Sequence, residues 1–232
     1  MRAPARSTLE NLDVIYEDNH LIAVNKLAGD LVQGDQTGDE PLTEVVKRYI
    51  ALRYNKPGNV FLGLVHRLDR PTTGILVLAR TSKALERMNA LFADRQTQKT
   101  YWAVVHQPPP EPQGRLVHWL ERRPAQNKSF AFDREAPGRK RAALSYRVVK
   151  QLQRYFLLEI DLETGRHHQI RAQLAAIGCT IKGDLKYGAP RSNSDGGIHL
   201  HARTLSFMHP VRKEPITLLA QPPADPVWDA CL

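Results

Sequence analysis

The chain has 232 residues, of which 33 are Lys or Arg and 24 are Asp or Glu, so its formal net charge is +9. This length suits one compact domain with a substantial core, and no apolar run approaches the roughly 20 residues that cross a bilayer. Its two cysteines, Cys179 and Cys231, exclude a disulfide framework and a zinc finger. The positive charge favours a polyanionic partner, because each neutralised phosphate releases counterions, and leaves RNA, DNA and anionic membranes open.

The N-terminal part of the chain predicts a flexible lead followed by a hairpin and a helix. Residues 1–12 carry basic side chains without the apolar core of a signal peptide, so we expect a cytoplasmic protein with one domain over 13–232. Apolar runs at 13–16 and 21–25, separated by turn residues, predict a hairpin. From Leu42 the apolar residues recur with the spacing of an amphipathic helix.

The next segment predicts a loop held between two buried strands. The strands are expected at 61–65 and 75–78, and Thr81 or Ser82 can cap the helix that follows. A further strand is expected at 100–105 because its residues are β-branched and aromatic. The run Pro108–Pro110 cannot continue that strand, and it predicts a subdomain boundary.

The C-terminal half combines a basic segment with strands and one short helix. Residues 127–141 predict a mobile basic loop, for which a solvated charge run and an RNA contact stay equally open. Strands are expected at 142–149 and 155–162. Beyond Gly165, a helix with an apolar stripe is expected to end at Gly178, with Arg171 at the edge of the stripe.

Asp69 is the candidate nucleophile of this chain. It stands between Arg67 and Arg70, ahead of Pro71, on a Pro-Thr-Thr-Gly turn that leads into an apolar strand. Flanking cations favour the charged form of a carboxylate, and the proline restricts the backbone ahead of it. A fixed, ionised carboxylate is suited to nucleophilic attack, although for a lone Asp in a basic loop composition alone favours a structural salt bridge, roughly two to one.

Three separated segments resemble the RluA-type family of RNA pseudouridine synthases. They are Leu21-Ile22-Ala23-Val24-Asn25-Lys26-Leu27-Ala28-Gly29, the string His66 to Arg80 around Asp69, and Gly165-Arg166-His167-His168-Gln169-Ile170-Arg171 with Ile181-Lys182-Gly183-Asp184 after it. The segment Leu200 to Pro210 also looks like the family's penultimate strand. The chain departs from the family pattern at His167, usually Thr, and at Leu27, usually Pro.

The resemblance implies roles for individual residues. Asp69 is the expected nucleophile, Tyr101 is expected to stack on the target base and to help remove the C5 proton, and Arg171 is expected to pair with Asp69. By itself Tyr101 is more typical of a strand core, and Arg171 of an exposed helix position. The candidate phosphate or ribose contacts are Arg67, Arg70, Arg166 and Lys182.

The fold implied by the resemblance is α+β, with a mixed, largely antiparallel sheet, helices on its outer sides and a central cleft. Because residues 1–12 are too few for the separate N-terminal RNA-binding domain of some relatives, we expect the catalytic domain without it. The implied substrate is structured RNA, either rRNA or tRNA, and the implied reaction needs no cofactor or metal. Nothing in the sequence demands a protein partner, so a monomer is expected.

Two other functions are compatible with parts of the sequence. A metal-dependent hydrolase could use Asp69 with His66, His167 and other histidines, but the spacing of these residues argues against it and no His-Glu-x-x-His motif occurs. His66 and His167 are as easily packed or hydrogen-bonded residues. A non-catalytic RNA-binding or ribosome-assembly protein would show the same charge, yet it would have no need for Asp69, Tyr101 and Arg171.

Overall fold

The computed structural model describes residues 6–35 and 37–232, which form two compact units. Unit 1 comprises the described residues through Gln98 with Ser194–Gly196 and Ala202–Pro223. Unit 2 comprises Lys99–Asn193, Gly197–His201 and Ala224–Leu232. The first division therefore falls at Gln98, so the boundary predicted at Pro108–Pro110 is wrong.

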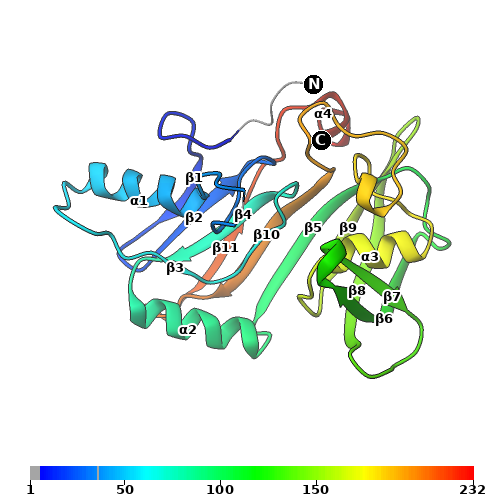
Figure 1. Cartoon of the computed structure of the whole chain (residues 1–232), viewed down its shortest axis with the longest axis horizontal. Coiled ribbons are helices and arrows are strands. Elements are labelled where there is room, and N and C mark those ends of the chain that lie inside the picture. Colours follow the sequence, from blue (N-terminus) through cyan, green and yellow to red (C-terminus); the bar gives the residue numbers. More distant parts are fainter. Residues whose placement is uncertain (1–5, 36) are drawn as a thin grey trace. The chain divides into compact units, whose positions relative to one another are not determined.

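Unit 1 is a sheet covered by one helix on each face (Figure 1). Ile22 and Val24 pack against α1, whereas Leu21 and Ala23 pack on the side of α2, because successive side chains of a strand point to opposite faces. The strand order is β1-β2-β4-β10-β11, with β3 also paired to β4. The elements are β1 (Val14–Glu17), β2 (Leu21–Lys26), α1 (Leu42–Arg53), β3 (Gly63–Leu64), β4 (Thr73–Ala79), α2 (Ser82–Ala93), β10 (Leu200–Met208) and β11 (Pro215–Leu219).

Unit 2 likewise has antiparallel strands with a helix on each face. Its order is β5-β9-β8-β6-β7, and Ile170 and Leu174 of α3 pack on one face while Trp228 of α4 packs on the other. The antiparallel prediction is confirmed by these registers. The elements are β5 (Thr97–Val105), β6 (Gln113–Arg123), η1 (Pro124–Gln126), β7 (Lys128–Phe132), β8 (Lys140–Gln151), β9 (Phe156–Leu162), α3 (Gln169–Ala176), η2 (Leu185–Tyr187) and α4 (Pro226–Cys231).

Local signals predicted several of these elements. The early hairpin, the helix from Leu42, the strands around Ile75 and Tyr101, and α3 all form where expected. Thr81 caps α2 by accepting a hydrogen bond from the Ala84 N–H at 3.2 Å. The mobile loop predicted over 127–141 is wrong, because Lys128–Phe132 forms β7, and β6 was not predicted at all.

The start of the chain is only partly described. Residues 1–5 lie outside the described part, so a flexible lead over 1–12 stays a prediction. Ser7 is buried, and its N–H and hydroxyl both donate to the Asp30 carboxylate, at 2.8 and 2.6 Å. Among the described residues, no helix is long and apolar enough to span a membrane.

Gly74 is required where β4 meets β10. Its φ is +110°, and a Cβ built there would lie 2.6 Å from the backbone N of Ala202 and closer still to the carbonyl oxygen. Both atoms are backbone, so the two strands would have to separate.

We expect Gly74→Ala to destabilise the protein by about 2–3 kcal/mol, through strain at positive φ and overpacking against backbone. Urea denaturation measures this change. Gly138→Ala is the matched control, because Gly138 also has positive φ, at +82°, but a Cβ added there would meet no atom within 4 Å. If both substitutions lowered the free energy of unfolding equally, the close approach of Gly74 to the backbone of β10 would contribute nothing to the effect of Gly74→Ala.

Candidate functional site

Asp69 lies on a short loop between two strands of unit 1, as predicted. The loop follows β3 and leads directly into β4, and the Asp69 carbonyl accepts a hydrogen bond from the Thr72 N–H at 3.0 Å. This bond closes a tight turn with Pro71 inside it. The Asp69 side chain is half-buried while Leu68 and Thr72 beside it are buried, so the loop holds the carboxylate at a defined place.

The ammonium group of Lys26 holds this loop in place through hydrogen bonds. Lys26 is fully buried at the end of β2, and its ammonium donates to the carbonyl oxygens of Leu27, Arg70 and Thr72 at 2.8–2.9 Å. Burial lowers the pKa of Lys26 to about 7, while the charges of Asp30 and Asp69 oppose this shift. The lysine therefore sets both the shape of the loop and part of the electrostatic field at Asp69.

The sequence pattern includes Lys26 only within a weak motif and predicts no role for it. The available signal is a lysine that ends an otherwise apolar strand, Leu21-Ile22-Ala23-Val24-Asn25-Lys26. A lysine at such a position is buried only if its ammonium is paired or hydrogen-bonded. Which groups bind it is decided by the pairing of β2 with β4, which places Lys26 opposite Gly74.

We expect Lys26→Met to destabilise the protein by about 2–3 kcal/mol, because three carbonyl groups lose their donor in a buried place. The pH dependence identifies the cause. The folded pKa, about 7, lies below the usual 10.5, so between these values the unfolded state binds more protons and wild-type stability rises with pH. Urea denaturation from pH 6 to 10 should show this rise in wild type and a smaller one in Lys26→Met. Parallel pH profiles would contradict the assignment.

The two arginines that flank Asp69 differ in their surroundings. Arg70 donates to the Asp39 carboxylate at 2.6 Å, and hydrogen bonds from Arg6 and Arg70 hold the pKa of Asp39 below its usual range. Arg67 is exposed and makes no ion pair with any residue that the structure describes. Arg67 is thus available to bind a phosphate. Arg70 could bind a phosphate only by giving up its contact with Asp39 or by contacting both groups at once.

His66 has a structural environment, in agreement with the packed alternative stated above. Its Nε2 accepts a hydrogen bond from the Val77 N–H at 3.0 Å, and its ring stacks on Phe92 with centroids 5.0 Å apart. A ring nitrogen that accepts from the backbone of β4 helps to fix the start of the loop. These contacts make His66 part of the support of Asp69.

Arg171 is buried in unit 2, where it pairs with Asp184. Its Nε and Nη2 donate to the two carboxylate oxygens at 2.7 and 2.8 Å, and both side chains are at most 5% exposed. This two-point contact fixes the plane of the guanidinium group. The sequence pattern predicts no role for Asp184, since nothing local links residues thirteen positions apart.

Tyr101 lies on β5 as predicted, opposite Ile160 of β9, and packs against the main apolar cluster of unit 2. Its side chain is half-buried. The strand therefore gives the ring a rigid support. The pairing of Arg171 with Asp69 and the contact of Tyr101 with a base stay predictions.

The remaining two candidate RNA contacts, Arg166 and Lys182, lie in unit 2, and only Arg166 is exposed. Lys182 donates to the Asn193 side-chain oxygen at 2.7 Å, so it is tied into the fold. Arg166 is exposed, and its Nε donates to the carbonyl oxygen of Arg141 at 3.3 Å. Arg166 thus lies next to the start of β8.

The unusual His167 contacts β7. Its Nδ1 lies 2.9 Å from the Ser129 hydroxyl, and its ring stacks on His168 with centroids 3.8 Å apart. His168 is buried against the Tyr187 hydroxyl at 3.0 Å, and burial lowers its pKa to about 2. The two histidines connect the start of α3 to the β6–β7 hairpin. Burial at this place keeps His168 neutral.

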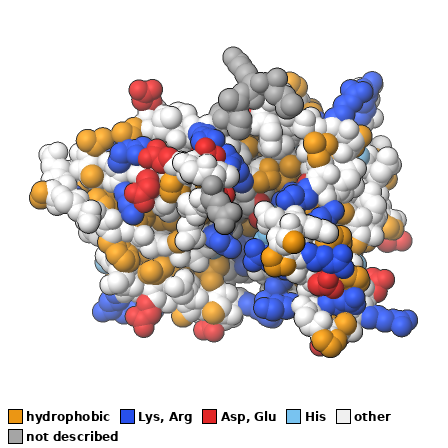
Figure 2. Space-filling view, in the orientation of Figure 1, with side chains coloured by type: hydrophobic (Ala, Val, Ile, Leu, Met, Phe, Trp, Pro, Cys, Tyr) orange, Lys and Arg blue, Asp and Glu red, His pale blue; other side chains and the backbone are white. Residues whose placement is uncertain are grey.

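The positive charge is concentrated in unit 2. The sequence of unit 2 holds 17 Lys and Arg against 10 Asp and Glu, a net charge of +7, whereas unit 1 holds 16 against 14, a net charge of +2. Figure 2 shows Lys and Arg side chains gathered over β6 and β7. An anionic ligand is therefore attracted mainly by unit 2.

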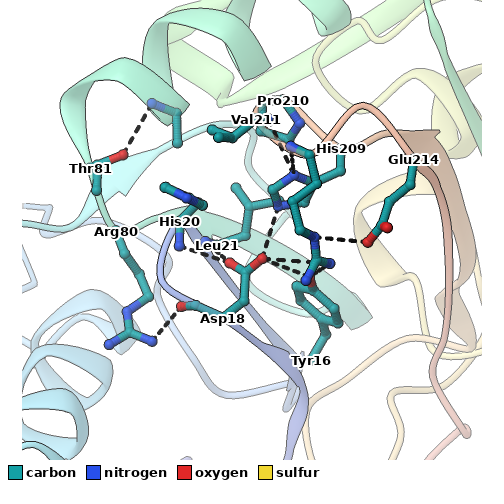
Figure 3. A network of polar contacts seen from close by, with 12 residues as sticks. Tyr16, Asp18, His20, Leu21, Arg80, Thr81, His209, Pro210, Val211 and Glu214 are labelled. Carbon is teal, nitrogen blue, oxygen red and sulfur yellow. Dashed lines mark hydrogen bonds and ion pairs between the residues drawn. The ribbon is translucent and has the colours of Figure 1, made fainter.

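A second polar cluster in unit 1 is structural. The Asp18 carboxylate accepts from the N–H groups of His20 and Leu21 and from the Tyr16 hydroxyl, at 2.7–2.8 Å (Figure 3). Burial alone would raise the pKa of Asp18, but these hydrogen bonds hold it below the usual range. Nε2 of the fully buried His209 lies 2.9 Å from Asp18, without the alignment of a hydrogen bond. The cluster joins the β1–β2 turn to the end of β10.

The metal-hydrolase alternative has no matching geometry. Among the described residues, no group of three or more His, Cys, Asp or Glu side chains is arranged to hold a metal ion. His66, His167 and His168 contact a backbone N–H, hydroxyl groups or aromatic rings.

Comparisons with known proteins agree with the resemblance seen in the sequence. A family model described as RNA pseudouridylate synthase matches residues 20–176. The chain is 33% identical over 224 residues to Ribosomal large subunit pseudouridine synthase D of Zymomonas mobilis, covering 92% of this chain and 70% of that protein. It is 31% identical over 239 residues to tRNA pseudouridine synthase C of Vibrio cholerae, covering 95% and 94%.

The fold has a solved counterpart as well. The structure of Human RNA Pseudouridylate Synthase Domain Containing 4 superposes with a TM-score of 0.78 at 26% identity, covering 94% of this chain and 92% of that one. Several curated relatives are longer than this chain, which spans 66% and 67% of the length of two of them.

Proposed function

The chain belongs to the family of RNA pseudouridylate synthases, and we propose that it isomerises specific uridines of structured RNA to pseudouridine with Asp69 as nucleophile. The observation that carries this proposal is the Asp69 loop. A carboxylate is held there by a closed turn and by a buried lysine bound to the loop carbonyls. A nucleophile needs this fixed position, because a small misplacement costs much of the rate.

The proposed reaction breaks the bond between N1 of uracil and C1′ of ribose and forms a bond between C5 and C1′. The C5 proton leaves and N1 gains a proton, so no atom is lost and no redox cofactor takes part. Asp69 attacks the ribose C1′ or the uracil ring, or assists departure through a glycal. The target base must first leave its stack, at a cost of a few kcal/mol.

The family resemblance also supplies the roles of the two residues from unit 2. We propose that Tyr101 stacks on the target base and helps to remove the C5 proton, and that the guanidinium of Arg171 orients the Asp69 carboxylate. The pair with Asp184 supports this role, because it fixes the guanidinium plane before substrate binds. Arg67, Arg70, Arg166 and Lys182 are proposed contacts to phosphate or ribose.

The rRNA and tRNA substrates named for the two relatives are the proposed substrate classes here. Both offer bases splayed out in loops. We place the reaction in the cytoplasm and propose that a monomer performs it. A non-catalytic RNA-binding role is the weaker alternative, because such a protein has no need for a carboxylate fastened in this manner.

The test is pseudouridine mapping with carbodiimide on total RNA from cells that lack the gene. Purified protein is added without metal or nucleotide. New pseudouridine at one or a few positions is the expected result, and the RNA in which it appears distinguishes rRNA from tRNA. No new pseudouridine in any RNA, together with RNA binding, would support the non-catalytic role.

A further inference from the structure

The β6–β7 hairpin has one face that α3 covers and one that it leaves open. Leu120 and Ala131 are cross-strand neighbours that pack toward Ala172 of α3. The next residues along each strand point the other way, since side chains alternate. The side chains of this second face are Trp119, Glu121, Arg123, Lys128, Phe130, Phe132 and Arg141, together called the outer hairpin face.

Cations lie on the aromatic rings of the outer hairpin face. The guanidinium of Arg123 lies 4.3 Å from the ring centroid of Phe130, and that of Arg139 lies 3.5 Å from the ring of Phe132. The ammonium of Lys128, at the edge of this face, lies 5.2 Å from the ring of Phe130 and 4.8 Å from the ring of Tyr187 on the α3 side. A ring holds a cation in place without neutralising it, so Lys128 keeps its full charge, and Arg123 and Arg139 keep all that their shared carboxylate, Glu121, does not offset.

Carboxylates are scarce at this place. Residues 121–141 contain seven Lys and Arg but only three Asp and Glu. Arg123 and Arg139 share Glu121. Within the described part of the chain, no carboxylate lies within ion-pair distance of these six cations: Arg122, Lys128, Lys140, Arg141, Arg166 and Lys186.

The cross-strand pair of Arg123 with Lys128 brings two positive charges together, which destabilises the hairpin. Arg123 and Lys128 stand directly opposite each other across the hairpin, beside the same ring. Like charges at directly opposite positions destabilise a β-ladder. Glu121 offsets part of this repulsion by pairing with Arg123, and an anion bound between Arg123 and Lys128 would remove more of it.

We propose that the outer hairpin face binds the sugar-phosphate backbone of RNA, with Arg123, Lys128 and Arg141 as phosphate contacts. RNA matches the face better than an acidic protein does, because a guanidinium group over a ring can donate to a phosphate and can also stack on a base. The proposal rests on the function proposed above. It adds an anchoring surface separate from the reacting groups.

The test compares two triple variants that remove the same charge from unit 2. The first is Arg123→Gln/Lys128→Gln/Arg141→Gln. The control is Arg115→Gln/Arg147→Gln/Arg154→Gln. Arg115 and Arg147 lie on the same sheet face at the far end of the strands, about 26 Å along β6 from Arg123, and are paired with Glu163 and Glu159.

The first measurement is binding of a fluorescent 20-residue oligouridylate at several salt concentrations, which requires no turnover. We expect the first variant to bind at least about tenfold more weakly and to lower the salt slope by about 2, since each phosphate contact on a single strand contributes about 0.7. The control should bind within about twofold of wild type. Equal weakening by both variants, or none by either, would overturn the proposal.

The second measurement is turnover on whichever RNA the wild type modifies. The first variant should raise KM and leave kcat unchanged, because its residues do not touch the reacting atoms. Arg141→Gln alone, an exposed change, should lower the salt slope by about 0.7 and serves if the triple variant folds poorly. Selective loss of oligouridylate binding in a protein that forms no pseudouridine would uphold this surface and reject only the proposed activity.

Discussion

Asp69→Asn is expected to abolish pseudouridine formation while leaving the fold and RNA binding intact. An amide has the size of the carboxylate but cannot act as the nucleophile, so we expect a rate loss on the order of 10⁴-fold or more, the scale of removing a reacting group. The hydrogen bonds from the Lys26 ammonium and the Thr72 N–H end on backbone carbonyl oxygens of the loop, so Asp69→Asn does not remove them.

The measurement is carbodiimide mapping of pseudouridine with matched amounts of each protein, together with thermal unfolding and RNA binding. Asp69→Ala is tested in parallel, because slow deamidation of asparagine would regenerate aspartate. Asp94→Asn is the control, since Asp94 is exposed at the end of α2 in the same unit. If Asp69→Asn kept a tenth of the wild-type rate, another group would have to be the nucleophile.

Asp184→Ala is expected to cost about 3–5 kcal/mol of folding free energy, the largest stability effect we predict. The substitution leaves the guanidinium of Arg171 buried without its carboxylate partner. Turnover should fall as well, since the two hydrogen bonds that fix the plane of Arg171 are lost. Urea denaturation and the mapping assay measure the two effects separately.

A double-variant cycle separates the fold from the function. Arg171→Met/Asp184→Ala removes both charges, so it should be more stable than Asp184→Ala while remaining inactive. Glu163→Ala is the matched control, because the exposed pair of Glu163 with Arg115 should contribute less than about 1 kcal/mol. Additive effects of the two single substitutions would show that the buried pair is not coupled. An active double variant would reject the proposed role of Arg171.

Unit 1 has the proposed nucleophile, Asp69, and the contacts that Lys26 and His66 make to support its loop are to backbone groups. Lys26 reaches the loop through carbonyl oxygens, and His66 accepts from the backbone N–H of Val77. Such contacts fix the position of the loop without depending on the side chains that face the substrate. Residues such as Arg67 can therefore change to suit an RNA without moving Asp69.

The sequence by itself determined the elements whose cause is local. The apolar spacing after Leu42 and the cap at Thr81 predict α1 and α2, because a helix satisfies its backbone within one segment. The Asp69 string and the family resemblance identified the proposed nucleophile, since these depend on residue order alone. The early hairpin followed from two apolar runs joined by a short turn.

Only the tertiary structure decided the features that depend on distant partners. The basic segment 127–141 looked like a loop, but Lys128–Phe132 pairs with β6, and β6 itself pairs with β8, from Leu120 with Lys140 to Gln113 with Arg147. In the same way, the neighbours of Lys26 and Arg171 come from other parts of the chain. A strand makes its hydrogen bonds with another strand, and a buried charge pairs with a residue that can be distant in the sequence. Neither partner can therefore be predicted from the local sequence pattern.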